Sequence, residues 1–195
     1  MVQENELDRP IVIVSGLPRS GTSMMMQMLD RGGLDVLADG VRVADEDNPR
    51  GYYEFEPVKR TKQDDSWLTQ AAGKAVKMVH LLLYDLPLDR PYRVVLMRRH
   101  MDEVLRSQST MLIRTGNQGA SIPLERLGRI FEQQIQDALA YLKEQPCFEV
   151  IEVRYDAVLS NPLAEAEAIH RFLGGELDLQ AMATAVEPSL YRQKS

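Results

Sequence analysis

The sequence predicts an α/β fold of three layers, with a central parallel sheet of about five strands flanked by helices. Two observations predict this fold class and its extent over one domain. Short β-branched runs alternate with longer stretches of helical period along the chain, and this alternation is typical of a parallel sheet covered by helices on both faces. No repeat, low-complexity tract or linker divides the 195 residues. We therefore expect a single domain over 1–195, with an N-terminal tail at 1–9 and a C-terminal tail at 188–195.

The expected strands are short apolar runs bounded by turn residues. In chain order they cover 11–14, 34–37, 75–79, 93–97 and 148–153. The third and fourth should be interior strands, because apolar residues fill them almost completely.

The expected helices are longer and show an apolar position every three or four residues. They cover 22–31, 101–114, 123–144 and 162–173, and the segment from 177 also begins as a helix. Asn161 and Pro162 supply an N-cap and a first-turn proline for the fourth helix. In the first helix we assign Met25 and Met28 to the core.

Composition limits the partners of this chain. It has 23 Lys and Arg against 29 Asp and Glu, a net charge of −6, which argues against nucleic-acid binding by general phosphate neutralisation. Its acidic N-terminus and short apolar runs predict neither an export signal nor a membrane span. One cysteine, Cys147, and three histidines give no zinc-binding spacing. We expect a cytoplasmic protein in a reducing compartment, with no metal required.

The segment between the first strand and the first helix is Gly-Leu-Pro-Arg-Ser-Gly-Thr-Ser, residues 16–23. Its spacing is that of a P-loop, G-x-x-x-x-G-K-[ST], except that Thr22 stands where the lysine should be. Such a loop curls its N–H groups around an oxyanion, and the helix N-terminus behind it adds partial positive charge. We expect a phosphate or sulfate site in which Arg19 offers its fork of donors. The alternative is a glycine turn that serves only tight packing.

Residues 17–23 resemble the 5′-phosphosulfate loop, P-[KR]-[SC]-G-T-[TS], of sulfotransferases that use 3′-phosphoadenosine 5′-phosphosulfate (PAPS). The resemblance implies a P-loop NTPase-like fold, sulfuryl transfer without a metal and adenosine 3′,5′-bisphosphate as a product. Cytosolic members often carry a tryptophan after the loop that stacks on adenine, where this chain has Met24. The resemblance assigns donor binding to Pro18, Arg19, Ser20, Gly21, Thr22 and Ser23.

The fourth expected strand is followed directly by Arg98 and Arg99, and Ser107 follows Arg99 by eight residues. The family holds the 3′-phosphate of its donor with an arginine at a strand end and a serine eight residues on, so the resemblance implies that role for Arg99 and Ser107. A buried arginine without a partner is costly, and an anion resolves the cost. The alternative is a solvated cluster in which both arginines pair with Asp102 and Glu103, and we favour it for Arg98.

Later segments are also similar to the family. Residues 154–158, 161–162 and 171–174 resemble its succession of Y-E-D-L, D/N-P and F-[LV]-G. The resemblance makes Tyr155 a candidate adenine contact, although a buried tyrosine that only packs at the strand end is the alternative. It also makes Arg192 a candidate for the 3′-phosphate. Because ligands of open α/β sheets collect at the carboxyl ends of the strands, both phosphate sites should face one crevice.

Sulfuryl transfer also requires charge stabilisation and a base for the proton of the acceptor. Lys77 matches the strand-end lysine of the family and would face the sulfuryl oxygens, unless it is only a surface lysine. Two residues compete as the base. His80 resembles the K-x-H of cytosolic members, one residue late. We favour Glu54, which follows the second strand among Tyr52, Tyr53 and Phe55.

The sequence thus favours a PAPS-dependent sulfotransferase that acts on a hydroxyl or amine of a small-molecule, carbohydrate, lipid or peptide acceptor. One alternative is an ATP-dependent small-molecule kinase of the same fold, which would need a P-loop lysine and a strand-end aspartate for Mg²⁺. The other is a non-catalytic module that binds nucleotides or anions.

Overall fold

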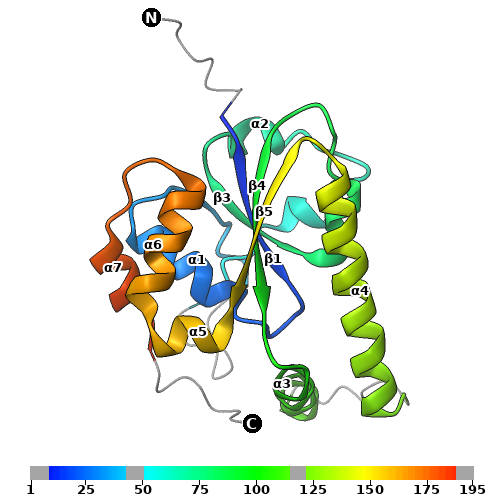
Figure 1. Cartoon of the computed structure of the whole chain (residues 1–195). Coiled ribbons are helices and arrows are strands. Elements are labelled where there is room, and N and C mark those ends of the chain that lie inside the picture. The colour runs from blue at the N-terminus through cyan, green and yellow to red at the C-terminus, as the bar shows by residue number, and fades with distance from the viewer. Residues whose placement is uncertain (1–8, 43–50, 115–121, 188–195) are drawn as a thin grey trace, which may run out of the picture.

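The computed structural model describes residues 9–42, 51–114 and 122–187. It is an α/β fold built on a five-stranded parallel sheet with the strand order β2-β3-β1-β4-β5. Helices α1, α6 and α7 lie on one side of the sheet and α4 on the other (Figure 1). The predicted three-layer fold is confirmed.

All five predicted strands form, within three residues of the expected ends. The third and fourth flank the central strand, which confirms that they are interior. The strands are β1 (Ile11–Gly16), β2 (Val36–Leu37), β3 (Ala75–Val79), β4 (Tyr92–Arg98) and β5 (Phe148–Arg154).

The predicted helices also form. The side chain of Asn161 accepts a hydrogen bond from the N–H of Ala164 at 3.3 Å and so caps α6, as expected. The helices are α1 (Thr22–Arg31), α3 (Met101–Arg114), α4 (Leu124–Glu144), α6 (Pro162–Leu173) and α7 (Leu179–Thr184).

Four short elements were not predicted. Two of them begin directly where a strand ends, which leaves no loop to signal the change. The four are α2 (Leu68–Ala71), α5 (Tyr155–Ser160) and two 3₁₀ segments, η2 (Glu56–Arg60) and η3 (His80–Asp85).

The central strand β1 is buried on both faces. Because successive side chains of a strand point to opposite faces, Val12 and Val14 join the core beneath α1 and α6, which includes Met25 and Met28. Ile11 and Ile13 join the opposite core, beneath α4. The assignment of both methionines to the core is confirmed.

Parallel strands bring their carboxyl ends to one edge of the sheet. Gly16 at the end of β1 pairs with Val79 of β3 and with Met97 of β4. The loop after β1, the end of β3 and the end of β4 therefore converge at this edge. In the described part of the chain, no helix has the length and apolarity that crossing a membrane requires.

Candidate active site

The loop from β1 to α1 has a backbone that only glycine fits at two positions. A Cβ on Gly16 would lie 2.6 Å from Ser20 Oγ, and one on Gly21 would lie 2.5 Å from the ring of Tyr155. Gly21 is the N-cap of α1 and has a φ of 100°. Arg19 has a φ of 71°, a left-handed conformation that is uncommon for a residue with a Cβ. The helix N-terminus behind this loop favours an anion.

A cavity of about 340 Å³ opens over this loop, a volume in the range of small-molecule sites. It brings together most of the predicted site residues, from five separate segments of the chain. Ser20 is buried and His80 does not line the cavity, and Arg192 lies outside the described residues. The predicted residues that line it are Pro18, Arg19, Gly21, Thr22, Ser23, Glu54, Lys77, Arg99, Ser107 and Tyr155.

The two predicted phosphate sites are linked by hydrogen bonds. Arg19 Nε donates to Ser107 Oγ at 2.9 Å, and Arg99 Nη1 donates to the carbonyl oxygen of Arg19 at 3.0 Å. The Arg99 guanidinium also lies over the ring of Tyr155, with Cζ 4.4 Å from its centroid. The end of β4 and the start of α3 thus hold the strained residue of the loop.

Arg99 is in turn held by Glu103, one helical turn along α3. Arg99 Nε donates to Glu103 Oε2 at 2.9 Å, and Glu103 is only 1% exposed. A buried carboxylate requires such a partner, since an unpaired charge in the interior is costly. Arg99 therefore makes the ion pair that the alternative interpretation expected, and it lines the cavity as well.

Arg98 points away from this site, because neighbouring strand residues face opposite sides. It donates to Glu132 at 2.9 Å and to Glu152 at 3.1 Å. The expectation that Arg98 belongs to a surface cluster is confirmed, but the partners predicted for it, Asp102 and Glu103, are wrong.

Lys77 lies in the wall of the cavity and not on the surface, with a side chain that is 13% exposed. Its Nζ donates to the carbonyl oxygen of Tyr52 and to Ser23 Oγ, and lies 3.9 Å from Glu54 Oε1. Burial lowers the pKa of Lys77 from its ordinary 10.5 to about 8, against the opposing effect of the Glu54 charge. Lys77 joins the phosphate loop to the segment that carries Glu54.

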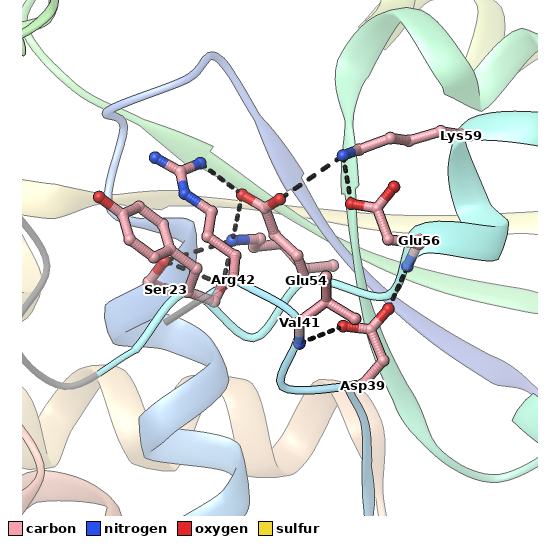
Figure 2. Close-up of polar contacts among 9 residues, drawn as sticks. Ser23, Asp39, Val41, Arg42, Glu54, Glu56 and Lys59 are labelled. Carbon is pink, nitrogen blue, oxygen red and sulfur yellow. Dashed lines mark hydrogen bonds and ion pairs between the residues drawn. The ribbon is translucent and has the colours of Figure 1, made fainter. Parts of the chain in front are cut away.

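Glu54 is surrounded by cations (Figure 2). Its Oε1 lies 2.7 Å from Arg42 Nη1, and its Oε2 lies 3.8 Å from Lys59 Nζ. The guanidinium of Arg42 also stacks on the ring of Tyr52, with Cζ 3.4 Å from the centroid. Together with Lys77, these contacts direct the carboxylate of Glu54 into the cavity, which it lines.

Asp39 fixes the path of the backbone around Glu54. Its Oδ1 accepts from the N–H of Val41 at 2.9 Å and its Oδ2 from the N–H of Glu56 at 2.6 Å, as Figure 2 shows. Its own N–H donates to the carbonyl oxygen of Glu54 at 3.0 Å. The hydrogen bond from the N–H of Glu56 lowers the pKa of Asp39 below its ordinary 3.8. Asp39 joins the chain after β2 to the chain before η2.

The aromatic surroundings expected for Glu54 are wrong for two of the three residues. Tyr53 donates its hydroxyl to Asp30 at 3.0 Å, and Phe55 packs edge-on against Trp67, with centroids 6.1 Å apart. Of the three aromatic residues, only Tyr52 lines the cavity. Cations, rather than an aromatic wall, set the environment of this carboxylate.

His80 is buried outside the cavity, at the start of η3. Its Nδ1 lies 3.4 Å from the carbonyl oxygen of Gly16, and its Nε2 lies 3.1 Å from Oε1 of Gln134 on α4. These contacts tie the end of β1 to α4. Of the two candidate bases, Glu54 faces the cavity and His80 does not.

Three residues of the site were not found by sequence reasoning. Glu103 was considered only as a surface partner, although its spacing of four residues from Arg99 is that of an ion pair on one helix face. Gln27 is the one polar residue in the apolar run 24–29, and it lines the cavity. No sequence pattern indicated Arg42, because its ion pair with Glu54 depends on the path of the chain around Asp39.

Metal-binding side chains are not grouped in the described residues: no three or more His, Cys, Asp or Glu lie together in an arrangement that would hold a metal ion.

Comparison with known proteins gives a match at the level of structure. No family model matches the chain, and neither does a curated protein. The sulfotransferase domain from the Synechococcus PCC 7002 olefin synthase matches with a TM-score of 0.58 at 12% identity, over 98% of this chain and 82% of that one. This chain has the fold of a sulfotransferase domain. The sulfotransferase domain from the curacin biosynthetic pathway also matches, with a TM-score of 0.54 at 13% identity, over 94% of this chain and 89% of that one.

Proposed function

We propose that this protein is a sulfotransferase that moves a sulfuryl group from PAPS to a hydroxyl or amine of an acceptor. One observation carries the proposal. Arg19 of the loop and the pair of Arg99 and Ser107 are 80 or more residues apart in the chain, yet they line one cavity and hydrogen-bond to each other. A donor with phosphate groups at both its 5′ and 3′ positions matches two cationic sites in one cavity. The sulfotransferase fold supports the same conclusion.

The chemistry of the cavity fits such a donor. Gly16 and Gly21 let the loop pack closely against Ser20 and the ring of Tyr155, and the start of α1 adds the N–H groups of its first turn. Arg19 would hold the phosphosulfate end, with Thr22 and Ser23 at the helix start. Arg99 and Ser107 would hold the 3′-phosphate, and Tyr155 would contact the nucleoside.

The transfer forms one bond to sulfur and breaks another. The acceptor oxygen or nitrogen attacks the sulfur, the bond from sulfur to the 5′-phosphate oxygen breaks, and adenosine 3′,5′-bisphosphate leaves. Glu54 accepts the proton of the acceptor. Arg19 and Lys77 stabilise the charge on the sulfuryl and phosphate oxygens during the transfer.

The spacing of Lys77 and Glu54 supports these roles. Lys77 Nζ is within hydrogen-bonding distance of Ser23 Oγ at the phosphate loop and lies 3.9 Å from Glu54. A cation at the sulfuryl group and a base at the acceptor must act on neighbouring atoms, and this pair faces the same part of the cavity. The ion pair with Arg42 orients the carboxylate of Glu54.

The first test is a magnesium-free thermal-shift comparison of adenosine 3′,5′-bisphosphate with ATP. At 100 times its Kd, the bisphosphate should add about 2.7 kcal/mol of stability, which raises the Tm of a chain of this size by about 5 to 10 °C. Stabilisation by ATP that depends on Mg²⁺ would instead favour the kinase.

The second test is turnover. Adenosine 3′,5′-bisphosphate should be released from PAPS faster when a panel of sugar, lipid, phenol and peptide acceptors is added. Tight binding of the bisphosphate without transfer to any acceptor class would favour the non-catalytic module.

A further inference from the structure

Gln27 is a buried polar residue of the cavity that the proposed mechanism does not use. It lies on α1, it is 8% exposed, and it lines the cavity. Its carboxamide makes no hydrogen bond within the described parts of the chain, and its nitrogen and oxygen are not among the fully enclosed atoms, so the amide is open to the cavity. Buried polar groups are almost always hydrogen-bonded. The amide of Gln27 is therefore expected to bind something that enters the cavity.

The position of Gln27 on α1 shows that its side chain does not fill the hydrophobic core. Its neighbours Met25, Met26 and Met28 are fully buried in the core beneath the sheet. Gln27 instead lies three and four residues after Met24 and Ser23, which places the three on one face of α1. All three line the cavity, so this face of α1 forms part of its wall.

The cavity beside Gln27 is suited to a flat ring. Met24 supplies apolar surface from α1, Ala185 supplies it from the chain after α7, and Tyr155 packs against Gly21. The cations that face the cavity come from other segments: the loop, β3, the β4–α3 corner and Arg42 after β2, while one carboxylate, Glu187, follows α7. Gln27 is thus an amide beside the apolar side chains of Met24 and Ala185, in a cavity whose cations come from other segments.

We propose that Gln27 recognises the adenine base of the nucleotide, an inference that rests on the proposed function. A carboxamide donates and accepts in one plane. Adenine presents an amino group beside a ring nitrogen that accepts, and glutamine pairs with this edge through two hydrogen bonds. Gln27 Oε1 accepts from the amino group and Gln27 Nε2 donates to the ring nitrogen, while Met24 packs on the face of the ring.

The test removes either the adenine amino group or the Gln27 carboxamide that accepts a hydrogen bond from it. Adenosine 3′,5′-bisphosphate is compared with purine riboside 3′,5′-bisphosphate, which lacks only the amino group, for the intact protein and for Gln27→Met. The intact protein should bind the adenosine ligand about 10- to 100-fold more tightly, the discrimination expected of a good bidentate contact. Gln27→Met should weaken the adenosine ligand and reduce this preference to less than about threefold. Methionine is close to glutamine in length and suits this methionine-rich helix.

Gln27→Glu should change the two affinities in a different way, and it replaces Gln27→Met in the test if the methionine variant does not fold. A glutamate still accepts from the amino group but faces the ring nitrogen with an acceptor. Both ligands should therefore bind less tightly, with the preference for adenosine retained. Gln70→Met, at an exposed glutamine of α2, is the matched control and should change neither affinity.

The outcomes separate the two proposals. If the intact protein binds neither bisphosphate, the proposed function fails and this inference fails with it. If it binds both but Gln27→Met weakens them equally, Gln27 has only a structural role, and the proposed function stands without it. Unchanged affinities in Gln27→Glu would equally overturn the inference.

Discussion

The two sides of the cavity are built differently. On the phosphate side, Arg19, Arg99, Glu103 and Ser107 are held by β4, α3 and the loop before α1, and the pair of Arg99 and Glu103 is nearly inaccessible. On the carboxylate side, Glu54 is held between cationic side chains that are more exposed, such as Arg42, which is 42% exposed. Regular elements fix the first side, and ion pairs on connecting segments fix the second.

This difference matches the tasks that we propose for each side. A donor that is the same in every reaction is best met by rigid groups, because preorganised contacts lose little entropy on binding. An acceptor is recognised by connecting segments, which vary without loss of the fold. Substitutions on the phosphate side should therefore change donor affinity or sulfuryl transfer, and those on the carboxylate side should change only transfer.

The largest expected effect is on the carboxylate side. Glu54→Gln should lower the rate of sulfuryl transfer by roughly 10²- to 10⁴-fold, the range for loss of a proton-transfer partner, while the Kd of adenosine 3′,5′-bisphosphate is unchanged. His80→Asn is the comparison, because His80 is buried outside the cavity. A larger loss in His80→Asn than in Glu54→Gln would transfer the role of base to His80.

The next effect is on the phosphate side. Arg19→Ala should lower the transfer rate on the order of 10²-fold or more, because it removes charge stabilisation from the transition state. Arg98→Ala is the matched control, since Arg98 pairs with Glu132 and Glu152 away from the cavity. An unchanged rate in Arg19→Ala, measured with saturating donor, would remove Arg19 from the mechanism.

Lys77 joins the two sides, and its titration should be visible in the pH profile. With a pKa of about 8, Lys77 is charged below pH 8 and neutral above it. If its charge stabilises the transfer, the rate at pH 9 should be roughly tenfold below that at pH 7, one factor of ten for each pH unit above the pKa. Lys77→Arg, which stays charged at both values, should abolish this fall. A rate that rises through pH 8 in the intact protein and not in Lys77→Arg would make neutral Lys77 the base.

The smallest effect should come from Asp39. Asp39→Asn loses one acceptor and leaves the N–H of Val41 or of Glu56 without its partner. At about 1 kcal/mol for a hydrogen bond, transfer should slow by about fivefold, and donor affinity should stay the same. A weaker affinity for adenosine 3′,5′-bisphosphate in this variant would contradict the separation of the two sides.

The same contrast explains which parts of the site could be predicted from the sequence. On the phosphate side, P-loop spacing predicted the glycines of the loop and Arg19, and the resemblance to the sulfotransferase family implied Arg99 with Ser107 eight residues later. Periodicity and caps also located α1, α3 and α6. These signals are local, so each can be read without knowledge of the rest of the fold.

The carboxylate side was predicted only in part. Glu54 was found as a candidate, but its partners Arg42 and Lys59 were not, because the path of the chain around Asp39 brings them together. The short helix α5 was missed for a related reason. Six residues that begin directly at Tyr155 carry no period, and packing against α6 stabilises a helix that is too short to persist alone.

The central claim is that Arg99 and Ser107 hold the 3′-phosphate of the donor. It is tested most directly by the Kd values of adenosine 3′,5′-bisphosphate and adenosine 5′-phosphate, measured without magnesium for the intact protein, Arg99→Lys and Ser107→Ala. Arg99→Lys leaves a cation beside buried Glu103, and Ser107→Ala leaves that ion pair untouched. The intact protein should prefer the bisphosphate by about 10-fold or more, the gain from a charge-assisted contact. Both variants should lose most of this preference, because binding of the bisphosphate weakens more than that of adenosine 5′-phosphate, which is affected only through the contacts of both residues with Arg19. Equal losses for both nucleotides, or no preference in the intact protein, would contradict the claim.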